Sequence, residues 1–101
     1  MSAEVRVLVY HSTVDGLGIE KAYREVSADL AGVPGMLGNE LLRSVGDGTG
    51  FVVLSRWRDL TSFTEWEQGA RHRDSTAPLR SYQDKKLAVP FGVYEVAAAY
   101  G

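Results

Sequence analysis

The chain has 101 residues, 45% of them hydrophobic, and a formal net charge of −2 at pH 7. This length and composition predict one globular domain covering 1–101. The small negative charge excludes the basic field that nucleic acid or an anionic membrane surface needs. The absence of cysteine excludes disulfides, thiolate catalysis and cysteine-ligated metal centres. No apolar run approaches the roughly 20 residues that span a bilayer, and the first residues lack a signal-peptide pattern, so we expect a cytoplasmic protein.

The first half of the chain predicts a strand and then a helix. Apolar residues fill both alternating sets of 4–11, as in a strand that is covered on both faces. A turn is expected at 13–18. Apolar residues then recur at helical spacing, with charged residues on the opposite side, at Ile19, Ala22, Tyr23, Val26 and Leu30. Gly32 should end this helix, and Pro34 favours an extended exit.

Two strands and a second helix follow. The segment 36–45 predicts a strand with Gly38 as a weak position or bulge, and the Gly- and Asp-rich segment 46–50 is typical of a hairpin loop. The strand 51–57 begins with an unbroken apolar run. Asp59 is a plausible N-cap of the next helix. That helix places Leu60, Phe63, Glu67 and Ala70 on one core-facing stripe, with Trp66 on its flank.

The end of the chain predicts a short helix at 76–82 with Pro78 in its first turn, a loop at 84–90 and a strand at 91–100. The resulting order is that of an α+β, ferredoxin-like βαββαβ fold, with a four-stranded antiparallel sheet and both helices on one face. The other face would expose valine, leucine and tyrosine side chains. We therefore expect a homodimer in which two sheets pack face to face.

Two motifs carry a family resemblance over nearly the whole chain. One is the run Val33-Pro34-Gly35-Met36-Leu37 before the hairpin, and the other is a strand–helix signature containing Phe51, Trp57, Asp59, Phe63 and Trp66. In these residues the chain resembles the antibiotic biosynthesis monooxygenase (ABM) family of dimeric α+β barrels. The resemblance implies one of two chemistries. One branch oxidises aromatic polyketides such as anthrones to quinones with O₂ and no flavin, heme or metal. The other branch degrades heme.

The heme-degrading branch uses an asparagine on the first strand, a tryptophan on the second helix and a histidine beyond it. Trp66 matches that tryptophan, and His72 follows it more closely than the ligand histidine usually does. The first strand offers Leu8, Val9 or Tyr10 at the asparagine position. The polyketide branch often has an asparagine four residues before the tryptophan that ends the third strand, and Val53 stands there.

Three residues are the candidate catalytic groups. His72 would act as a general base, or as a heme ligand through a ring nitrogen, although an exposed loop histidine is the alternative. His11, at the end of the first strand, is its rival as the base. Trp66 would form one wall of an aromatic cleft, or else lie at the flank of the core or of the dimer interface. Asn39 would donate to a substrate carbonyl or oxyanion, or make a contact at the sheet edge or between subunits.

The candidate substrate-binding residues are Tyr10, His11, Phe63, Arg71 and Tyr82. The tyrosines could instead be structural, and Arg71 would bind a carboxylate or remain solvated. The sequence holds no phosphate loop, dinucleotide fingerprint or metal-ligand spacing. The preferred hypothesis is a cofactor-free monooxygenase that uses O₂ and a small polycyclic aromatic substrate. A heme-binding enzyme and a non-catalytic, ligand-binding or cyclase-like dimer are the alternatives.

Overall fold

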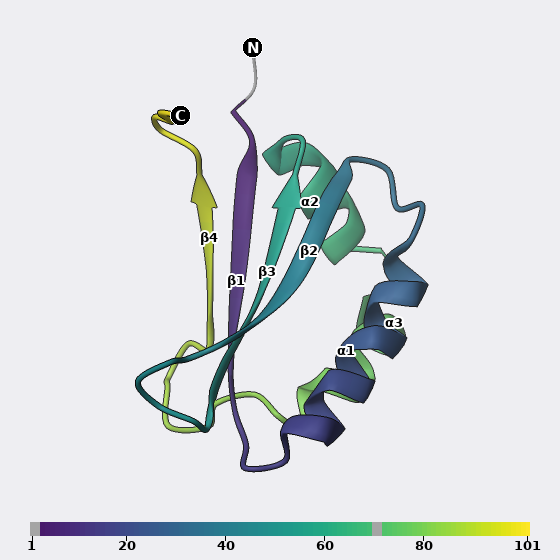
Figure 1. Ribbon diagram of the computed structural model, residues 1–101. Coiled ribbons are helices and arrows are strands. Elements are labelled where there is room, and N and C mark those ends of the chain that lie inside the picture. The colour runs from purple at the N-terminus through teal and green to yellow at the C-terminus, as the bar shows by residue number, and fades with distance from the viewer. Residues whose placement is uncertain (1–2, 70–71) are drawn as a thin grey trace.

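The computed structural model describes residues 3–69 and 72–101, without the side chains of 72–74. In these ranges the elements are β1 (Val5–Ser12), α1 (Gly16–Leu30), β2 (Met36–Arg43), β3 (Gly50–Trp57), α2 (Leu60–Glu67), α3 (His72–Arg80) and β4 (Phe91–Glu95). The strands form one antiparallel sheet in the order β2-β3-β1-β4, with β1 and β3 at its centre (Figure 1). The predicted α+β, ferredoxin-like fold is confirmed.

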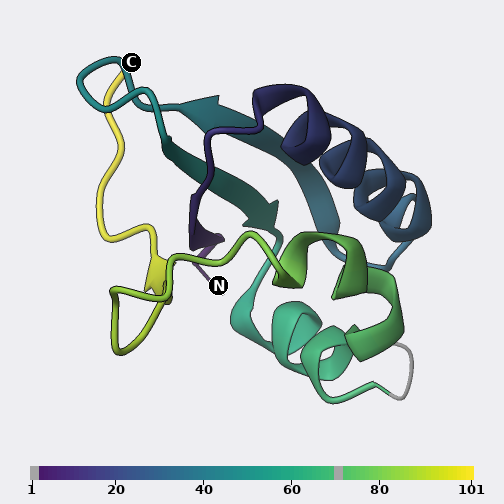
Figure 2. The same cartoon turned by 90° about the horizontal axis from the view of Figure 1, so that it is seen from below.

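The three helices of the described residues lie on one face of the sheet, with α1 beside α3, and no described helix covers the other face (Figure 2). No described helix is both long enough and apolar enough to cross a membrane. Two predicted boundaries were wrong by four or five residues. The helix α3 begins at His72 instead of 76, so Pro78 lies inside it. The strand β4 ends at Glu95 instead of Tyr100, because Glu95 pairs with Val5, the first residue of the neighbouring strand β1.

Gly35 and Gly38, at the start of β2, have structural roles. Gly35 has φ +84°, and a Cβ added there would lie 2.3 Å from the Ser62 side chain, so only glycine fits this turn. Its carbonyl accepts from the Arg58 amide at 2.8 Å, which fixes the start of β2 against the segment before α2. At Gly38 the register of β2 against β3 shifts, which confirms the predicted bulge.

The core lies between the sheet and the helices. The predicted stripe of α1 is confirmed, because Ile19, Ala22, Val26 and Leu30 are buried and Tyr23 packs against them. The helix α2 begins after Asp59, whose side chain accepts from the Ser62 amide at 2.8 Å, as predicted. This capping satisfies one N–H that the first turn of the helix leaves without a partner.

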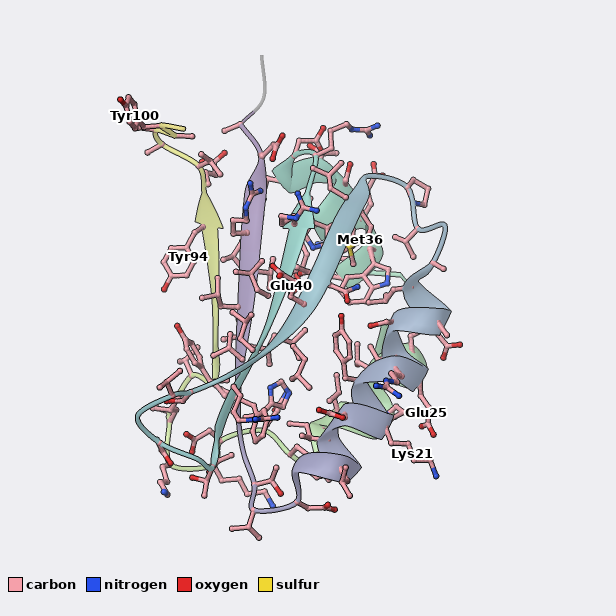
Figure 3. The ribbon with its side chains drawn as sticks, viewed as in Figure 1. Lys21, Glu25, Met36, Glu40, Tyr94 and Tyr100 are labelled. Carbon is pink, nitrogen blue, oxygen red and sulfur yellow. The ribbon has the colours of Figure 1, made fainter. Side chains whose placement is uncertain are left out.

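Alternate residues of the same strands point to opposite faces. Val5, Val7, Val9 and His11 of β1 face the helices, whereas Arg6, Leu8 and Tyr10 face away from them. The open face also carries Glu40, Leu42, Val52, Leu54, Arg56 and Tyr94. Figure 3 shows Tyr94 on the side of β4 away from the helices, and Lys21 and Glu25 on the outer side of α1.

Candidate functional site

A cavity of about 370 Å³ lies between the covered face of the sheet and the helices. Its volume falls at the lower end of the range of about 300–1,000 Å³ that is usual for small-molecule sites. The lining is mainly apolar and comes from every strand and helix. It includes Val7, Val9, Val26, Leu30, Met36, Val53, Leu79 and Phe91, together with the aromatic and polar groups described below. The fold therefore leaves a ligand-sized space, partly open to solvent, between the sheet and the helices.

Three aromatic rings form one end of this cavity. The centroid of Trp57 lies 5.5 Å from that of Phe63 and 5.3 Å from that of Trp66. Trp57 has no solvent exposure, and its Nε1 donates to Ser55 Oγ at 2.9 Å. Flat apolar surfaces held in this way suit an aromatic ligand, because edge and face contacts between rings are favourable.

His11 lies in the wall near the end of β1 and is only 3% exposed. Its Nδ1 is 3.0 Å from the Val9 carbonyl oxygen, which can only accept, so Nδ1 carries the proton and Nε2 keeps its lone pair. Burial lowers the pKa of His11 from 6.5, and the hydrogen bond to Val9 opposes this only in part. His11 is therefore neutral at pH 7, in the form that can accept a proton.

Asn39 supplies a polar patch on the β2 side of the cavity. Ser27 Oγ donates to Asn39 Oδ1 at 3.0 Å, and Tyr23 Oη makes a short hydrogen bond to the same oxygen. The Tyr23 hydroxyl also lies 3.1 Å from the backbone oxygen of Asn39. Two side chains of α1 thus fix the amide, and Asn39 is Cα partner to Ser55 across the sheet.

The structure brings four of the predicted site residues together around this cavity. Trp66, Asn39, His11 and Phe63 all line it.

The other four predicted residues do not join them within the described structure. Tyr10 lies on the open face, opposite Val52. Tyr82 places its hydroxyl against Gly18 in the first turn of α1 and does not line the cavity. His72 is described only as the first residue of α3, and its side chain lies outside the described part; Arg71 lies wholly outside it.

Sequence reasoning missed several lining residues. Trp57 had been used only as a family marker, Tyr23 only as part of a helical stripe, and Ser27, Ser55 and Arg80 not at all. The alternation of Val53, Ser55 and Trp57 along β3 places a serine between two core residues, which is a signal that could have identified Ser55. Ser27 and Arg80 give no such signal, because serine and arginine are ordinary on exposed helical surface.

The residues needed for heme degradation are only partly in place. Trp66 lines the cavity, whereas Val9 takes an inward position of β1 near where that branch has its asparagine. The side chain of His72 lies outside the described residues. Among the described residues, no group of three or more histidine, aspartate or glutamate side chains is placed to hold a metal ion.

A second hollow, of about 590 Å³, lies at the surface where the segment 31–34 approaches α2. Its lining is about half polar and includes Asp29, Glu65 and Ser62, so it lacks the aromatic enclosure of the first cavity. Trp66 lines both spaces. The indole therefore stands in the wall between the inner cavity and this hollow.

Comparison with known proteins finds one matching family and related proteins from Streptomyces. The family described as antibiotic biosynthesis monooxygenase matches residues 18–77. Protein SchA of Streptomyces halstedii is 29% identical over 82 residues, which are 79% of this chain and 22% of that protein. A 42.8 kDa protein in the whiE locus of Streptomyces coelicolor is 29% identical over 79 residues, which are 76% of this chain and 20% of that protein. The chain thus spans about a fifth of the length of these curated relatives.

Solved structures share the fold at low sequence identity. SnoaB, described as a cofactor-independent oxygenase from Streptomyces nogalater, is 18% identical with a TM-score of 0.78, and the match covers 97% of each chain. A conserved protein from Methanosarcina mazei is 12% identical with a TM-score of 0.75, and the match covers 92% of each chain.

Proposed function

The chain belongs to the antibiotic biosynthesis monooxygenase family, and on that premise we propose that it is a cofactor-independent monooxygenase. Its substrate would be a polycyclic phenol or anthrone of polyketide type, oxidised to a quinone by O₂. The observation that carries this proposal is the inner cavity, in which three aromatic rings and one buried, neutral imidazole line the same space. The relationship to SnoaB and to the two Streptomyces proteins is consistent with it.

The first step would be removal of a proton from the substrate. An anthrone methylene or a phenol is acidic enough to yield a proton to a positioned base. Sequence alone favoured His72 for this role. The described geometry supports His11, because its side chain lines the cavity and its hydrogen bond to Val9 leaves Nε2 as the basic atom.

The electron-rich anion would then react with O₂ itself. Transfer of one electron gives a substrate radical and superoxide, and their recombination forms a carbon–oxygen bond in a peroxide. The proton held by the imidazolium returns to the peroxide, and loss of water converts the methylene carbon to a carbonyl. One O₂ is consumed and one water released per substrate. The apolar cavity would exclude competing water, and the Asn39 amide would stabilise negative charge on the substrate oxygen.

An oxygen-electrode assay with anthrone tests the proposal. We expect the purified, colourless protein to consume one O₂ per anthrone, and His11→Gln to lower turnover at least about tenfold, as loss of a general base does. His72→Gln is the matched control, with the same substitution at the other histidine. A tenfold loss in His72→Gln with unchanged His11→Gln would return the role to His72. Anthrone binding without O₂ uptake would replace the oxygenase by a non-catalytic ligand-binding dimer.

We also propose that a second copy of the chain covers the open face of the sheet. Leu42 and Tyr94 are 40% and 54% exposed there, and Leu8, Val52 and Leu54 extend the same apolar surface across the central strands. A monomer rarely leaves so continuous an apolar face in water. A two-fold dimer would bury it by packing the same surface of each subunit against the other.

A further inference from the structure

The hydrogen bonds at Asn39 run in one direction. Its Oδ1 accepts from the hydroxyls of Tyr23 and Ser27, so the acceptor end of the amide is already occupied from the α1 side. The Nδ2 carries two N–H donors and makes no hydrogen bond to any residue that the structure describes. What Asn39 can offer to a ligand in the cavity is therefore a donor.

The neighbouring Ser55 also keeps a hydrogen-bond donor that no residue in the described part of the chain uses. Ser55 lies opposite Asn39 in the sheet and lines the same cavity. Its Oγ accepts from the buried Trp57 Nε1 at 2.9 Å, which leaves its own proton to be donated. Two adjacent side chains of β2 and β3 thus each keep an unused donor beside a space whose other walls are mostly apolar. A ligand oxygen that can only accept is the group that satisfies both.

We propose that Asn39 and Ser55 form a carbonyl-binding site, and that Tyr23 and Ser27 are positioning residues that hold the Asn39 amide with its nitrogen toward the ligand. This inference rests on the proposed function for the identity of the site, and it adds the substrate feature that the site recognises. The ligand is an aromatic ketone or the enolate derived from it. A hydrocarbon of the same shape leaves both donors unsatisfied, which costs affinity.

The position of His11 fixes which way such a ligand lies. Ser55 is partner to Val7, and His11 lies four residues further along β1, about 13 Å at 3.3 Å per residue. Asn39 is two strands from β1, about 10 Å across the sheet. The backbones of Asn39 and His11 are therefore roughly 16 Å apart. The cavity between them has a hydrogen-bond donor at the Asn39 end and an acceptor, His11 Nε2, at the other. The carbonyl of a fused-ring ligand lies at Asn39, and its acidic group lies toward His11.

Binding of two matched ligands tests the site. Fluorenone and fluorene have the same three rings and differ in the carbonyl oxygen, and fluorenone has no methylene to be oxidised. We expect Asn39→Ala to weaken fluorenone binding by at least about tenfold, the usual scale for one lost buried donor, and fluorene binding by less than about twofold. Val53→Ala is the control, because it enlarges the same cavity without changing a hydrogen bond and should affect both ligands equally.

The C=O stretching frequency of ¹³C-labelled fluorenone, measured by infrared spectroscopy, reports hydrogen bonding to the carbonyl and does not respond to packing alone. Donation to the carbonyl lowers its frequency, so the band should shift down in the wild-type complex. It should return part of the way in Asn39→Asp, whose carboxylate offers only acceptors, because Ser55 still donates. Tyr23→Phe and Ser27→Ala should each broaden or partly reverse the shift while binding fluorene normally. Equal losses for both ligands, or no shift in the wild-type protein, would overturn the inference.

The outcomes separate this inference from the proposed function. Selective fluorenone binding with the shifted band, in a protein that consumes no O₂ with anthrone, would keep the carbonyl site and remove the oxygenase. O₂ consumption in a protein whose Asn39→Ala and Val53→Ala variants behave alike would keep the oxygenase and remove the carbonyl site.

Discussion

The two faces of the sheet are built from the same strands and end in different environments. Along β1 and β3, every second residue points to the face that the helices cover, and the residues between them point to the face that no described helix covers (Figure 2). Both sets are rich in apolar side chains, yet the covered face holds the core and an inner cavity, whereas the open face remains half-exposed. The difference shows that apolar character alone does not assign a role to a residue. The role of a residue depends on whether helices pack against its face of the sheet.

The comparison also explains where chemistry can occur. On the covered face, burial lowers the pKa of the His11 imidazole, and hydrogen bonds are stronger than they are in water. On the open face, Arg6 and Arg56 stand opposite each other, with their charges in or near water. The same alternation therefore separates a site for reaction from a surface for association.

The largest expected effect is at the centre of the covered face. Trp57→Ala should lower the free energy of unfolding by about 3–5 kcal/mol, because it removes a fully buried indole and its contacts with Phe63 and Trp66. Arg56→Ala, one residue earlier and on the open face, should change it by less than about 0.5 kcal/mol. Urea unfolding followed by circular dichroism measures both. Equal effects would contradict the assignment of the two faces.

A smaller effect is expected on the open face. Leu8→Lys should weaken the proposed dimer at least about tenfold, since a lysine there would be buried between two sheets, opposite Leu54 and Gly92, without an acidic partner across the sheet. The monomer should remain folded, because position 8 lies on the face of the sheet that no described helix covers. Analytical ultracentrifugation measures the dissociation constant. Leu17→Lys, the same change at a residue of α1 that is 82% exposed, is the control. A dimer that is equally stable in both variants would place the interface elsewhere.

The smallest expected effect is the contribution of His11 to the pH dependence of the free energy of unfolding. Because the pKa of His11 is below 6.5 in the folded protein, the unfolded chain takes up the proton first as the pH falls. The free energy of unfolding should therefore decrease from pH 7 downward through 6.5 and level off below the folded pKa. The carboxyls of Asp47 and Asp59 have lowered pKa values and titrate outside this window.

His11→Gln should remove the decrease between pH 7 and 5, as measured by unfolding in urea at each pH. His72→Gln carries the same change at the other histidine and should retain the slope. A decrease that persists in His11→Gln and vanishes in His72→Gln would show that the buried imidazole does not control stability in this range.

Local signals in the sequence were enough for most of the elements. Three of these signals act over a few neighbouring residues, so their effects can be predicted without knowing the fold. They are the helical spacing of the buried apolar residues in α1, the Asp59 cap and the glycine at the bulge of β2. The start of α3 was missed because 72–75 is polar and carries no apolar period. The strand end at Glu95 was missed because it depends on where its partner begins.

The sequence by itself determined the fold class, the apolar stripe of α1 and the candidates Trp66 and Asn39, since periodicity and residue type act locally. The expected core stripe of α2 was wrong at Leu60 and Glu67, which are exposed, and Ala70 lies outside the described residues. Only the tertiary structure decided that Tyr10 leaves the cavity while His11, the next residue, enters it, and that Tyr23 and Ser27 reach Asn39. A one-residue step in a strand reverses the face, and the contact between α1 and β2 joins residues 12 and 16 positions apart. Both depend on how helices pack on the sheet, which no short stretch of sequence specifies.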